Sequence, residues 1–505
     1  MALDRLAGAG SGRPRKRIAG VIIGISLLVL TVVLPPPAGM PGLAWHVAGI
    51  AALMAAWWVT EALPVAATAL VPVVAFPIAG VGGIQQAAAP YANPLIFLFL
   101  GGFMLALALE RWNLHRRIAL TVLNRVGARP AALVAGFLVT TATLSMWVSN
   151  TATAMLMLPI GLSVIKLLHA DGVAALPAGE DRNFAIALLL SIAYGATIGG
   201  LGTLIGTPPN ALLAAYMAET HGVSIGFGQW MLLGVPLVVI MLPLAWLVLT
   251  RVAFPVGRAA IPGAQDVIAH EVGALGPMRP PEIRVAVVFG VTAALWMTRP
   301  AINHIFPDLA LSDPAIAIGA ALALFAIPAN AGNGECLLNW DWAKRLPWGV
   351  LILFGGGLSL AAAISQSGLA LWIGDAMTAG AGWPVFFIVL LIAFIVIFLT
   401  EITSNTATAA VFLPLVAAFA LSIGASPITL MVPVALAASC AFMMPVATPP
   451  NAIVFASGAV TIPHMARAGF LLNLAAIFLI VLASYSLVPL VFGAAVFGAA
   501  VFGTG

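Results

Sequence analysis

Charged residues are scarce in this sequence. Asp, Glu, Lys and Arg together make up 7% of the 505 residues, whereas globular domains average about 25%. Apolar residues account for 62% and the mean hydropathy is +1.13. So few charges cannot cover a water-soluble surface, and a bilayer-spanning helix needs about 20 mostly apolar residues. The composition therefore predicts an all-α polytopic membrane protein embedded in a lipid bilayer.

Cysteine and histidine patterns are also absent. Cys336 and Cys440 lie far apart and give no disulfide framework, and the seven histidines show no metal-ligand spacing. The net charge of +4 is small, so we expect no nucleic-acid partner and interpret the basic residues as a topology signal. Residues 1–17 do not resemble a cleaved signal peptide and predict a basic cytoplasmic tail.

The positive charges predict an orientation. With nearly all Lys and Arg on the cytoplasmic side, the N-terminus is cytoplasmic, the C-terminus is outside, and the membrane is the cell inner (plasma) membrane. Only Arg299 then lies on the wrong side. About 11 transmembrane helices result, near 18–36, 43–60, 62–80, 93–112, 183–218, 229–250, 284–302, 311–329, 347–368, 428–458 and 468–492.

Two apolar stretches remain, 131–165 and 385–420, and each contains the phrase SNTATA. Each is too long for one span, and both of its ends must face the same side. We therefore expect two re-entrant helical hairpins, with the polar phrase at the tip. The first is entered from the cytoplasm, because Arg129 and Lys166 bracket it. The second is entered from outside, through a loop without Lys or Arg.

The chain also repeats itself in inverted orientation. The segment from Ile96 aligns with that from Leu351 at the offset that separates the SNTATA copies, 255 residues. TPPN occurs at Thr207–Asn210 and at Thr448–Asn451. Inverted repeats place the binding site of many secondary transporters at the repeat interface, near the bilayer midplane. We expect the units 1–17 tail, 18–92 scaffold helices, 93–254 first repeat, 255–346 cytoplasmic connection and linking scaffold helices, 347–492 second repeat and 493–505 low-complexity tail.

These motifs suit ion binding. Non-helical backbone at membrane depth must be buried or line a watery cavity. Asn, Ser and Thr can offer oxygens to a cation or donors to an anion, and the helix that follows each tip directs its N-terminal amides toward an anion. Pro-Pro should interrupt the helix in each TPPN segment and free the carbonyls of Gly206 and Ala447 for a small cation. The pattern predicts two cation sites beside one anion site.

Together, the paired SNT and TPPN motifs, Trp57–Val81 and Ala438–Val454 resemble the divalent-anion:sodium symporters, which carry dicarboxylates, citrate or sulfate with sodium. The resemblance covers roughly residues 18–492. It implies a homodimer with scaffold and transport domains that works as an elevator, without an organic cofactor. It also implies roles for particular residues. Substrate contacts would come from Asn150, Thr151, Thr207, Asn405, Thr406 and Thr448. One sodium site would use Ser145, Ser149, Asn150 and Gly206, and its mate Thr400, Thr403, Asn405 and Ala447.

Neither hairpin core nor either TPPN segment contains Lys or Arg. A dianion there would face a large desolvation cost without cations, which favours a symporter for a C4-dicarboxylate such as succinate, malate or fumarate. Sulfate:sodium symport and sodium-independent dicarboxylate exchange remain alternatives. An enzyme is disfavoured because Ser149 and Ser404 lack a repeated neighbouring base. The roles of Glu61, Glu401 and the terminal VFGAA repeat stay open.

Overall fold

The computed structural model describes residues 13–167, 179–330, 334–376 and 382–493. Within these ranges all the regular elements are helices. The β-type pairing found there is one isolated antiparallel bridge between Pro328 and Cys336. The terminal VFGAA repeat lies outside the described residues. Eight of the helices in the described part are long and apolar enough to cross a membrane, and shorter apolar helices accompany them. The prediction of an all-helical membrane protein is confirmed.

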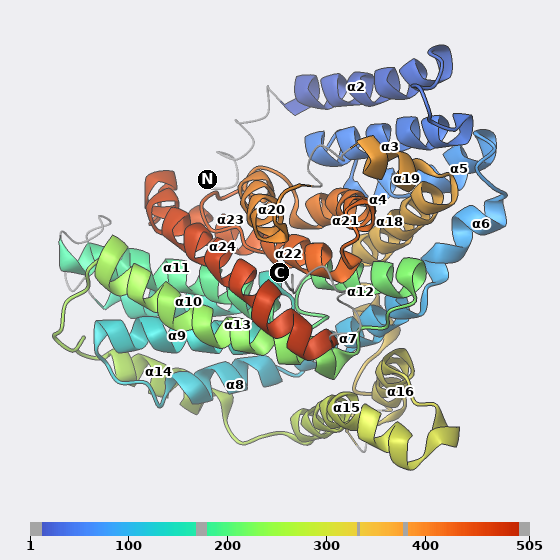
Figure 1. The fold of residues 1–505 in the computed structure, drawn as a ribbon. Helices are drawn as coiled ribbons and strands as arrows, with labels where there is room; N and C mark the ends of the chain where they lie inside the picture. The colour runs from blue at the N-terminus through green and yellow to red at the C-terminus, as the bar shows by residue number, and fades with distance from the viewer. Residues whose placement is uncertain (1–12, 168–178, 331–333, 377–381, 494–505) are drawn as a thin grey trace.

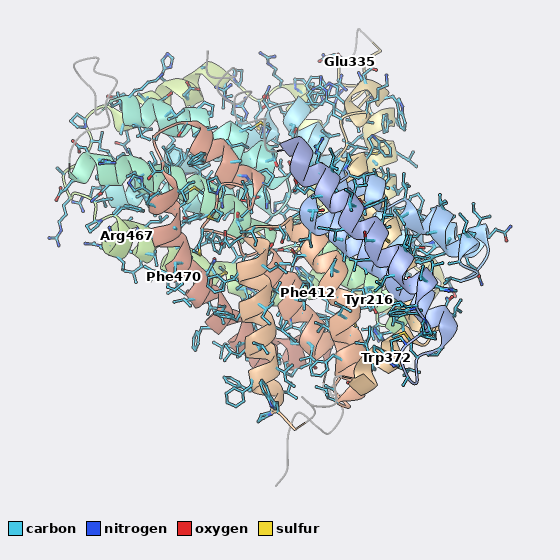
Figure 2. The ribbon with its side chains drawn as sticks, turned by 90° about the horizontal axis from the view of Figure 1, so that it is seen from above. Tyr216, Glu335, Trp372, Phe412, Arg467 and Phe470 are labelled. Atoms are coloured by element: carbon cyan, nitrogen blue, oxygen red, sulfur yellow. The ribbon has the colours of Figure 1, made fainter. Side chains whose placement is uncertain are left out.

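An N-terminal group of helices lies at one side of the molecule (Figure 1). Its members are α2 Arg13–Val33, α3 Gly42–Thr60, α4 Val65–Thr68, α5 Val71–Ile78, α6 Ile84–Ala88 and the 3-10 turn η1 Ala89–Ala92. Seen from above, α2 crosses the outer face of the molecule (Figure 2). Its apolar side chains are widely exposed, as expected for a helix that faces lipid. Gly24 allows α2 to approach the Trp57 ring of α3, and Gly49 of α3 approaches Thr31.

The span expected at 62–80 is interrupted. Residues 69 and 70 separate α4 from α5, because Pro72 has no N–H to bond the carbonyl four residues earlier. Within the break, the Ala69 carbonyl accepts a hydrogen bond from the Tyr91 hydroxyl. The apolar length of 62–80 predicts one span, whereas Pro64, Pro72 and Pro77 are the sequence signal for the interruption.

Two sets of helices follow the same order along the chain. The first comprises α7 Pro94–Arg111, α8 Leu114–Leu123, α9 Pro130–Ser145, α10 Asn150–Lys166, α11 Glu180–Gly200, α12 Pro208–His221, α13 Phe227–Leu247 and the π-helical turn η2 Val248–Ala253. The second comprises α18 Trp348–Gln366, α19 Leu369–Ala376, α20 Val385–Thr400, α21 Asn405–Ser422, α22 Pro427–Ala438, α23 Pro449–Ala456 and α24 Ile462–Phe492. Between the sets lie α14 Ala264–Leu275, α15 Pro280–Ile305, η3 Pro307–Leu309, α16 Asp313–Ala326 and α17 Trp340–Ala343.

Matched glycines support matched helix contacts in the two sets. A Cβ on Gly101 of α7 would lie 2.5 Å from the Ala317 backbone of α16. A Cβ on Gly356 of α18, at the offset of the sequence repeat, would lie 2.1 Å from the Ala69 carbonyl oxygen. Because neither position has room for a side chain, each repeat packs its first helix directly on a neighbouring backbone.

The last helix of each set packs on the preceding helix interruption. A Cβ on Gly234 of α13 would lie 2.4 Å from the Leu201 carbonyl oxygen, and one on Gly469 of α24 would lie 2.4 Å from the Phe442 carbonyl oxygen. Leu201 and Phe442 belong to the connections between α11 and α12 and between α22 and α23. Helices α13 and α24 are therefore fitted closely to the two interruptions.

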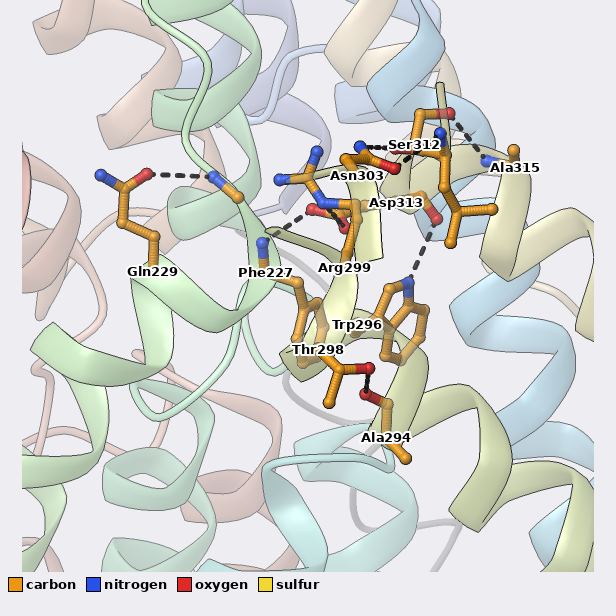
Figure 3. Close-up of polar contacts among 12 residues, drawn as sticks. Phe227, Gln229, Ala294, Trp296, Thr298, Arg299, Asn303, Ser312, Asp313 and Ala315 are labelled. Carbon is orange, nitrogen blue, oxygen red and sulfur yellow. Dashed lines mark hydrogen bonds and ion pairs between the residues drawn. The ribbon is translucent and has the colours of Figure 1, made fainter. Parts of the chain in front are cut away.

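Arg299, the exception to the charge pattern, is neutralised locally (Figure 3). Its Nε lies 2.7 Å from Asp313 Oδ1. Asp313 Oδ2 accepts from the Phe227 backbone N–H at 2.8 Å, and the Asp313 carbonyl accepts from Trp296 Nε1 at 3.1 Å. The pair joins α15 and α16 to the start of α13, which explains why a lone arginine is tolerated at this position.

Removing the carboxylate alone should destabilise the protein. We expect Asp313→Ala to cost roughly 2 kcal/mol, less than the 3–5 kcal/mol typical of fully buried pairs, because the Arg299 side chain is 24% exposed. Thermal unfolding in detergent measures this. Asp341→Ala, which breaks the exposed pair with Lys344, is the control and should not shift the transition measurably. An unchanged transition in Asp313→Ala would contradict the assignment.

Candidate functional site

Both SNTATA segments lie at breaks between paired helices. Helix α9 ends at Ser145 and α10 begins at Asn150, while α20 ends at Thr400 and α21 begins at Asn405. Ser149 caps α10 by accepting a hydrogen bond from the Ala152 N–H at 3.3 Å. Such a cap occupies only one of the free N–H groups in the first turn of a helix, so each tip presents further donors.

Oxygen atoms converge at the first tip. Asn150 Oδ1 lies 2.5 Å from Ser145 Oγ and 3.2 Å from the carbonyl oxygens of Ala196 and Gly206. The serine hydroxyl has one proton to donate, so the amide oxygen faces two carbonyl oxygens with no proton between them. With the Asn150 amide turned over, its nitrogen donates toward Ser145 Oγ and the two carbonyls, and the cluster is satisfied without an ion. A cation among these groups would be faced by the amide oxygen in the other orientation.

The second tip has a corresponding cluster. The Thr400 hydroxyl lies 2.7 Å from Asn405 Oδ1 and 3.0 Å from the Ala438 carbonyl oxygen. Its side chain is fully buried. Thr400 thus matches Ser145, and Asn405 matches Asn150. The Thr403 hydroxyl, in contrast, is engaged locally with the Leu399 carbonyl and the Thr408 hydroxyl at 2.8 and 2.7 Å, so its backbone is the more available group for a ligand.

Each TPPN segment begins a helix after an interruption, as predicted. The first asparagine, Asn210, donates from Nδ2 to the carbonyls of Gly200 and Thr203 at 3.1 and 2.9 Å. The second, Asn451, donates to the carbonyls of Ala441 and Met444 at 3.3 and 3.0 Å. These bonds hold the non-helical connections in place. Sequence analysis missed this role, although the repetition of the asparagine was a visible signal.

The two repeats meet through these interruptions. Helix α10 contacts α23, and α12 contacts α21 and α22. Thr207 Oγ1 lies 3.4 Å from Ser439 Oγ, which joins the first TPPN segment to the end of α22. Thr207 and Thr448 are both 4% exposed, and Thr448 Oγ1 accepts from the Asn451 N–H at 3.3 Å. The N-termini of four helices are thereby brought into one region.

Two threonine hydroxyls in this region are available. Thr151 and Thr406 occupy the first turns of α10 and α21 and are half-buried. Their hydroxyls make no hydrogen bond with the part of the chain that the structure describes. Among the candidate residues, Ser145 and Thr400 are buried, Ser149 is exposed, and Gly206 and Ala447 are buried beside their TPPN motifs. Glu61 does not belong to either oxygen cluster. It is exposed and ends α3 in a left-handed conformation.

The donor set fits a small hard cation. Hydroxyl, amide and carbonyl oxygens gather at both tips, and interrupted helices coordinate Na⁺ in this way through unwound carbonyls. A Cβ on Gly200 would lie 3.1 Å from the Asn150 side chain and from the Gly206 carbonyl oxygen, so the glycine keeps the first cluster clear. Ala196, Ala438 and Ser439 were not predicted, because isolated alanines and serines in apolar helices carry no distinguishing pattern.

The fold is that of a helical membrane transporter. The YdaH transporter of Alcanivorax borkumensis has a TM-score of 0.56 with 14% identity, over 92% of this chain and 98% of that one. The MtrF efflux pump of Neisseria gonorrhoeae has a TM-score of 0.58 with 15% identity, over 92% of this chain and 94% of that one. At these identities the likeness concerns the fold alone.

The family follows from closer matches. The model of the sodium:sulfate symporter transmembrane region matches residues 15–493, and the chain belongs to this family. The sodium-dependent dicarboxylate transporter SdcS of Staphylococcus saprophyticus is 45% identical over 483 residues, which cover 94% of this chain and 92% of the relative. Its counterpart in Staphylococcus aureus strain USA300 is 44% identical over 479 residues, with the same coverage. The family resemblance expected from the sequence is confirmed.

A methyl group at Gly206 should disturb the first oxygen cluster. The added Cβ would lie 2.5 Å from the Gly200 carbonyl oxygen, so the Gly206 carbonyl must move. We expect Gly206→Ala to weaken cation binding roughly 10–100-fold, the range for altered support of a metal ligand. Thermal unfolding titrated with sodium chloride against choline chloride measures the affinity. Gly290→Ala is the control, because no atom lies within 4 Å of its Cβ position. Equal affinities in both variants would contradict this assignment.

Proposed function

We propose that this protein imports a divalent anion, most specifically a C4-dicarboxylate such as succinate, malate or fumarate, by symport with sodium ions. The observation that carries the proposal is the paired geometry of the tips. Asn150 and Asn405 each take part in an oxygen cluster and also begin a helix. A cation and an anion can therefore share the same asparagine. The names of the relatives, sodium-dependent dicarboxylate transporters, support the same conclusion.

Electrostatics explains the coupling. Neither hairpin core nor either TPPN segment contains a Lys or Arg to balance a dianion, and a buried uncompensated charge is strongly unfavourable. Sodium ions in the two oxygen clusters would supply positive charge beside the anion. Substrate binding then requires sodium, and sodium binding becomes more favourable once the substrate is present.

The proposed sodium sites follow the two tips. The first uses Ser145, Ser149, Asn150 and the Gly206 carbonyl, with the Ala196 carbonyl as an additional oxygen. The second uses Thr400, the Thr403 backbone, Asn405 and the Ala447 carbonyl. The first site is supported by the grouping of the Ser145 hydroxyl and the Ala196 and Gly206 carbonyls around the Asn150 amide, which can turn its oxygen toward a cation. The second is supported by the Thr400–Asn405 contact at 2.7 Å.

The proposed substrate site lies between the tips. Asn150, Thr151, Asn405 and Thr406 supply amide and hydroxyl donors, and Thr207 and Thr448 lie beside them in the TPPN segments. Helix N-termini add favourable interactions with negative charge. Two matched donor sets suit a solute with two carboxylates. Sulfate needs only one compact set, and the uptake experiment below tests it directly.

The proposed transport cycle is an elevator in a homodimer of the inner (plasma) membrane. The hairpins, re-entrant from opposite sides, would move with α11–α13 and α22–α24 against a scaffold that includes α2–α6, α15 and α16. The N-terminus would be cytoplasmic and the C-terminus outside, because basic residues concentrate in the predicted cytoplasmic loops. The close fit of Gly234 and Gly469 to the interruptions supports a common moving unit.

Purified protein in proteoliposomes tests the function. We expect an inward sodium gradient to drive accumulation of labelled succinate, and replacement of sodium by choline to abolish it. Excess unlabelled malate or fumarate should compete, whereas sulfate should not. Preferential competition by sulfate would indicate a sulfate symporter. Equal uptake without sodium, dependent on internal dicarboxylate, would indicate an exchanger. A proton gradient that suffices alone would contradict sodium coupling.

Substitutions at the second tip separate the two roles. Asn405→Ala removes an oxygen proposed for both ligands, so we expect the half-saturating concentrations of sodium and of succinate each to rise about tenfold or more, as for hydrogen bonds to charged groups. Thr406→Ala should raise mainly that of succinate. Initial uptake rates at varied sodium and succinate measure both quantities. An unchanged sodium dependence in Asn405→Ala would refute the shared ligand.

A further inference from the structure

Glu401 is a buried carboxylate at the second tip, one residue after Thr400. Its side chain is 3% exposed. Oε1 accepts from the backbone N–H groups of Phe442 and Met443 at 2.7 and 2.9 Å, and Oε2 from those of Met443 and Met444 at 3.0 and 2.9 Å. Asn473 Nδ2 of α24 donates to Oε1 at 2.8 Å.

No basic side chain forms an ion pair with Glu401 within the described ranges. Its negative charge is stabilised by dipoles alone, from three backbone N–H groups and one amide. Hydrogen bonds to a charged acceptor are about twice as strong as those between neutral groups. The carboxylate therefore fixes the 442–444 connection firmly. Because these donors are neutral, its negative charge has no opposite charge beside it at the tip.

In the first repeat, the hairpin tip is linked to the corresponding connection without a charged side chain. Met146 stands at the position equivalent to Glu401, and Thr203 at that equivalent to Met444. There the Thr203 hydroxyl donates to the Met146 carbonyl at 2.5 Å, which is a single neutral bond between tip and connection. The two repeats thus match in their asparagines and in their interruptions but differ in this support.

The support bears directly on the second oxygen cluster. Residues 442–444 lead to Ala447, and the Asn451 amide holds the carbonyls of Ala441 and Met444 in the same connection. On the other side, Glu401 follows Thr400, whose hydroxyl contacts Asn405 and Ala438. The Glu401 carboxylate therefore ties the end of α20, next to Thr400, to the 442–444 connection that leads to Ala447, and its charge attracts a nearby cation.

We infer that Glu401 is a positioning residue for the second sodium site and makes that site the tighter of the two. It does so by fixing the 442–444 connection and by supplying negative charge, without touching the substrate. This inference rests on the proposed sodium symport. It predicts that sodium fills the second site first, before the first site and the dianion.

Neutralising the carboxylate tests the inference. Glu401→Gln keeps the shape of the side chain but loses the charge and places an amide N–H₂ opposite backbone donors. We expect the half-saturating sodium concentration for succinate uptake to rise about tenfold, the difference between charged and neutral acceptors. The KM for succinate at saturating sodium should change less than about twofold, because a residue that only supports the cation site leaves the substrate contacts intact.

Thermal unfolding in increasing sodium, without substrate, provides a second readout that does not depend on transport. The stabilisation should shift to higher sodium in Glu401→Gln. Glu61→Gln is the matched control, since it removes one negative charge from an exposed helix end and should behave as the unaltered protein. A general loss of stability would lower the unfolding temperature at every sodium concentration and leave the half-effective concentration unchanged, which would overturn the inference.

Asn473→Ala is a milder variant that keeps the carboxylate and its three backbone N–H donors. It loses one donor, and we expect a rise in half-saturating sodium of about two- to fourfold. If Glu401→Gln fails to fold, an unchanged sodium dependence in Asn473→Ala overturns the inference. Sodium-independent uptake by the unaltered protein would refute the proposed function itself, which distinguishes the two failures.

Discussion

The structure depends on one constraint, that backbone carbonyl and N–H groups released at a helix break inside a membrane must find partners. The chain interrupts helices at two hairpin tips and at two TPPN segments. Each TPPN interruption is held by an asparagine that donates to two carbonyls, Asn210 in one repeat and Asn451 in the other. The carbonyls and amides that are left converge at the tips. The groups proposed to bind ligands are therefore those that the asparagine bonds of the TPPN interruptions leave unengaged.

The two repeats show which features of this arrangement are shared and which are free to differ. The asparagines at the tips and in the TPPN motifs occupy equivalent sequence positions and make equivalent contacts in both repeats. The glycines of α7 and α18 are also equivalent in position, and each lets its helix pack on a neighbouring backbone. The link between tip and connection differs, with a threonine hydroxyl in one repeat and a carboxylate in the other. The two proposed cation sites, although built from the same ligand types, need not have the same affinity.

Much of this fold could be predicted from local chemistry. SNTATA is a polar phrase in an apolar stretch, and the helix breaks after Ser145 and Thr400 extend to its first residue, with the next helices starting at Asn150 and Asn405. Pro-Pro marks the starts of α12 and α23 for the steric reason expected. The interruption at Ala69 was missed, although its prolines were visible, because apolar length was given more weight than the missing N–H groups.

The parts of the site that could not be predicted depend on tertiary contacts. Ala196 contributes a carbonyl, which every residue has, so no side chain reveals it. Ser439 meets Thr207 only because the repeats interlock. The partners of Glu401 come from two other segments, and the sequence could not decide between an ion pair and a cluster of amides.

The seating of α13 and α24 on the interruptions has a consequence for the surrounding lipid. Both helices also carry outward-facing apolar side chains, including Leu232 at 63% exposure and Leu490 at 80%. Any displacement of the interruptions would move the apolar outer surfaces of α13 and α24 along the neighbouring lipid acyl chains. The viscosity and thickness of the bilayer would therefore enter the rate of the proposed elevator movement.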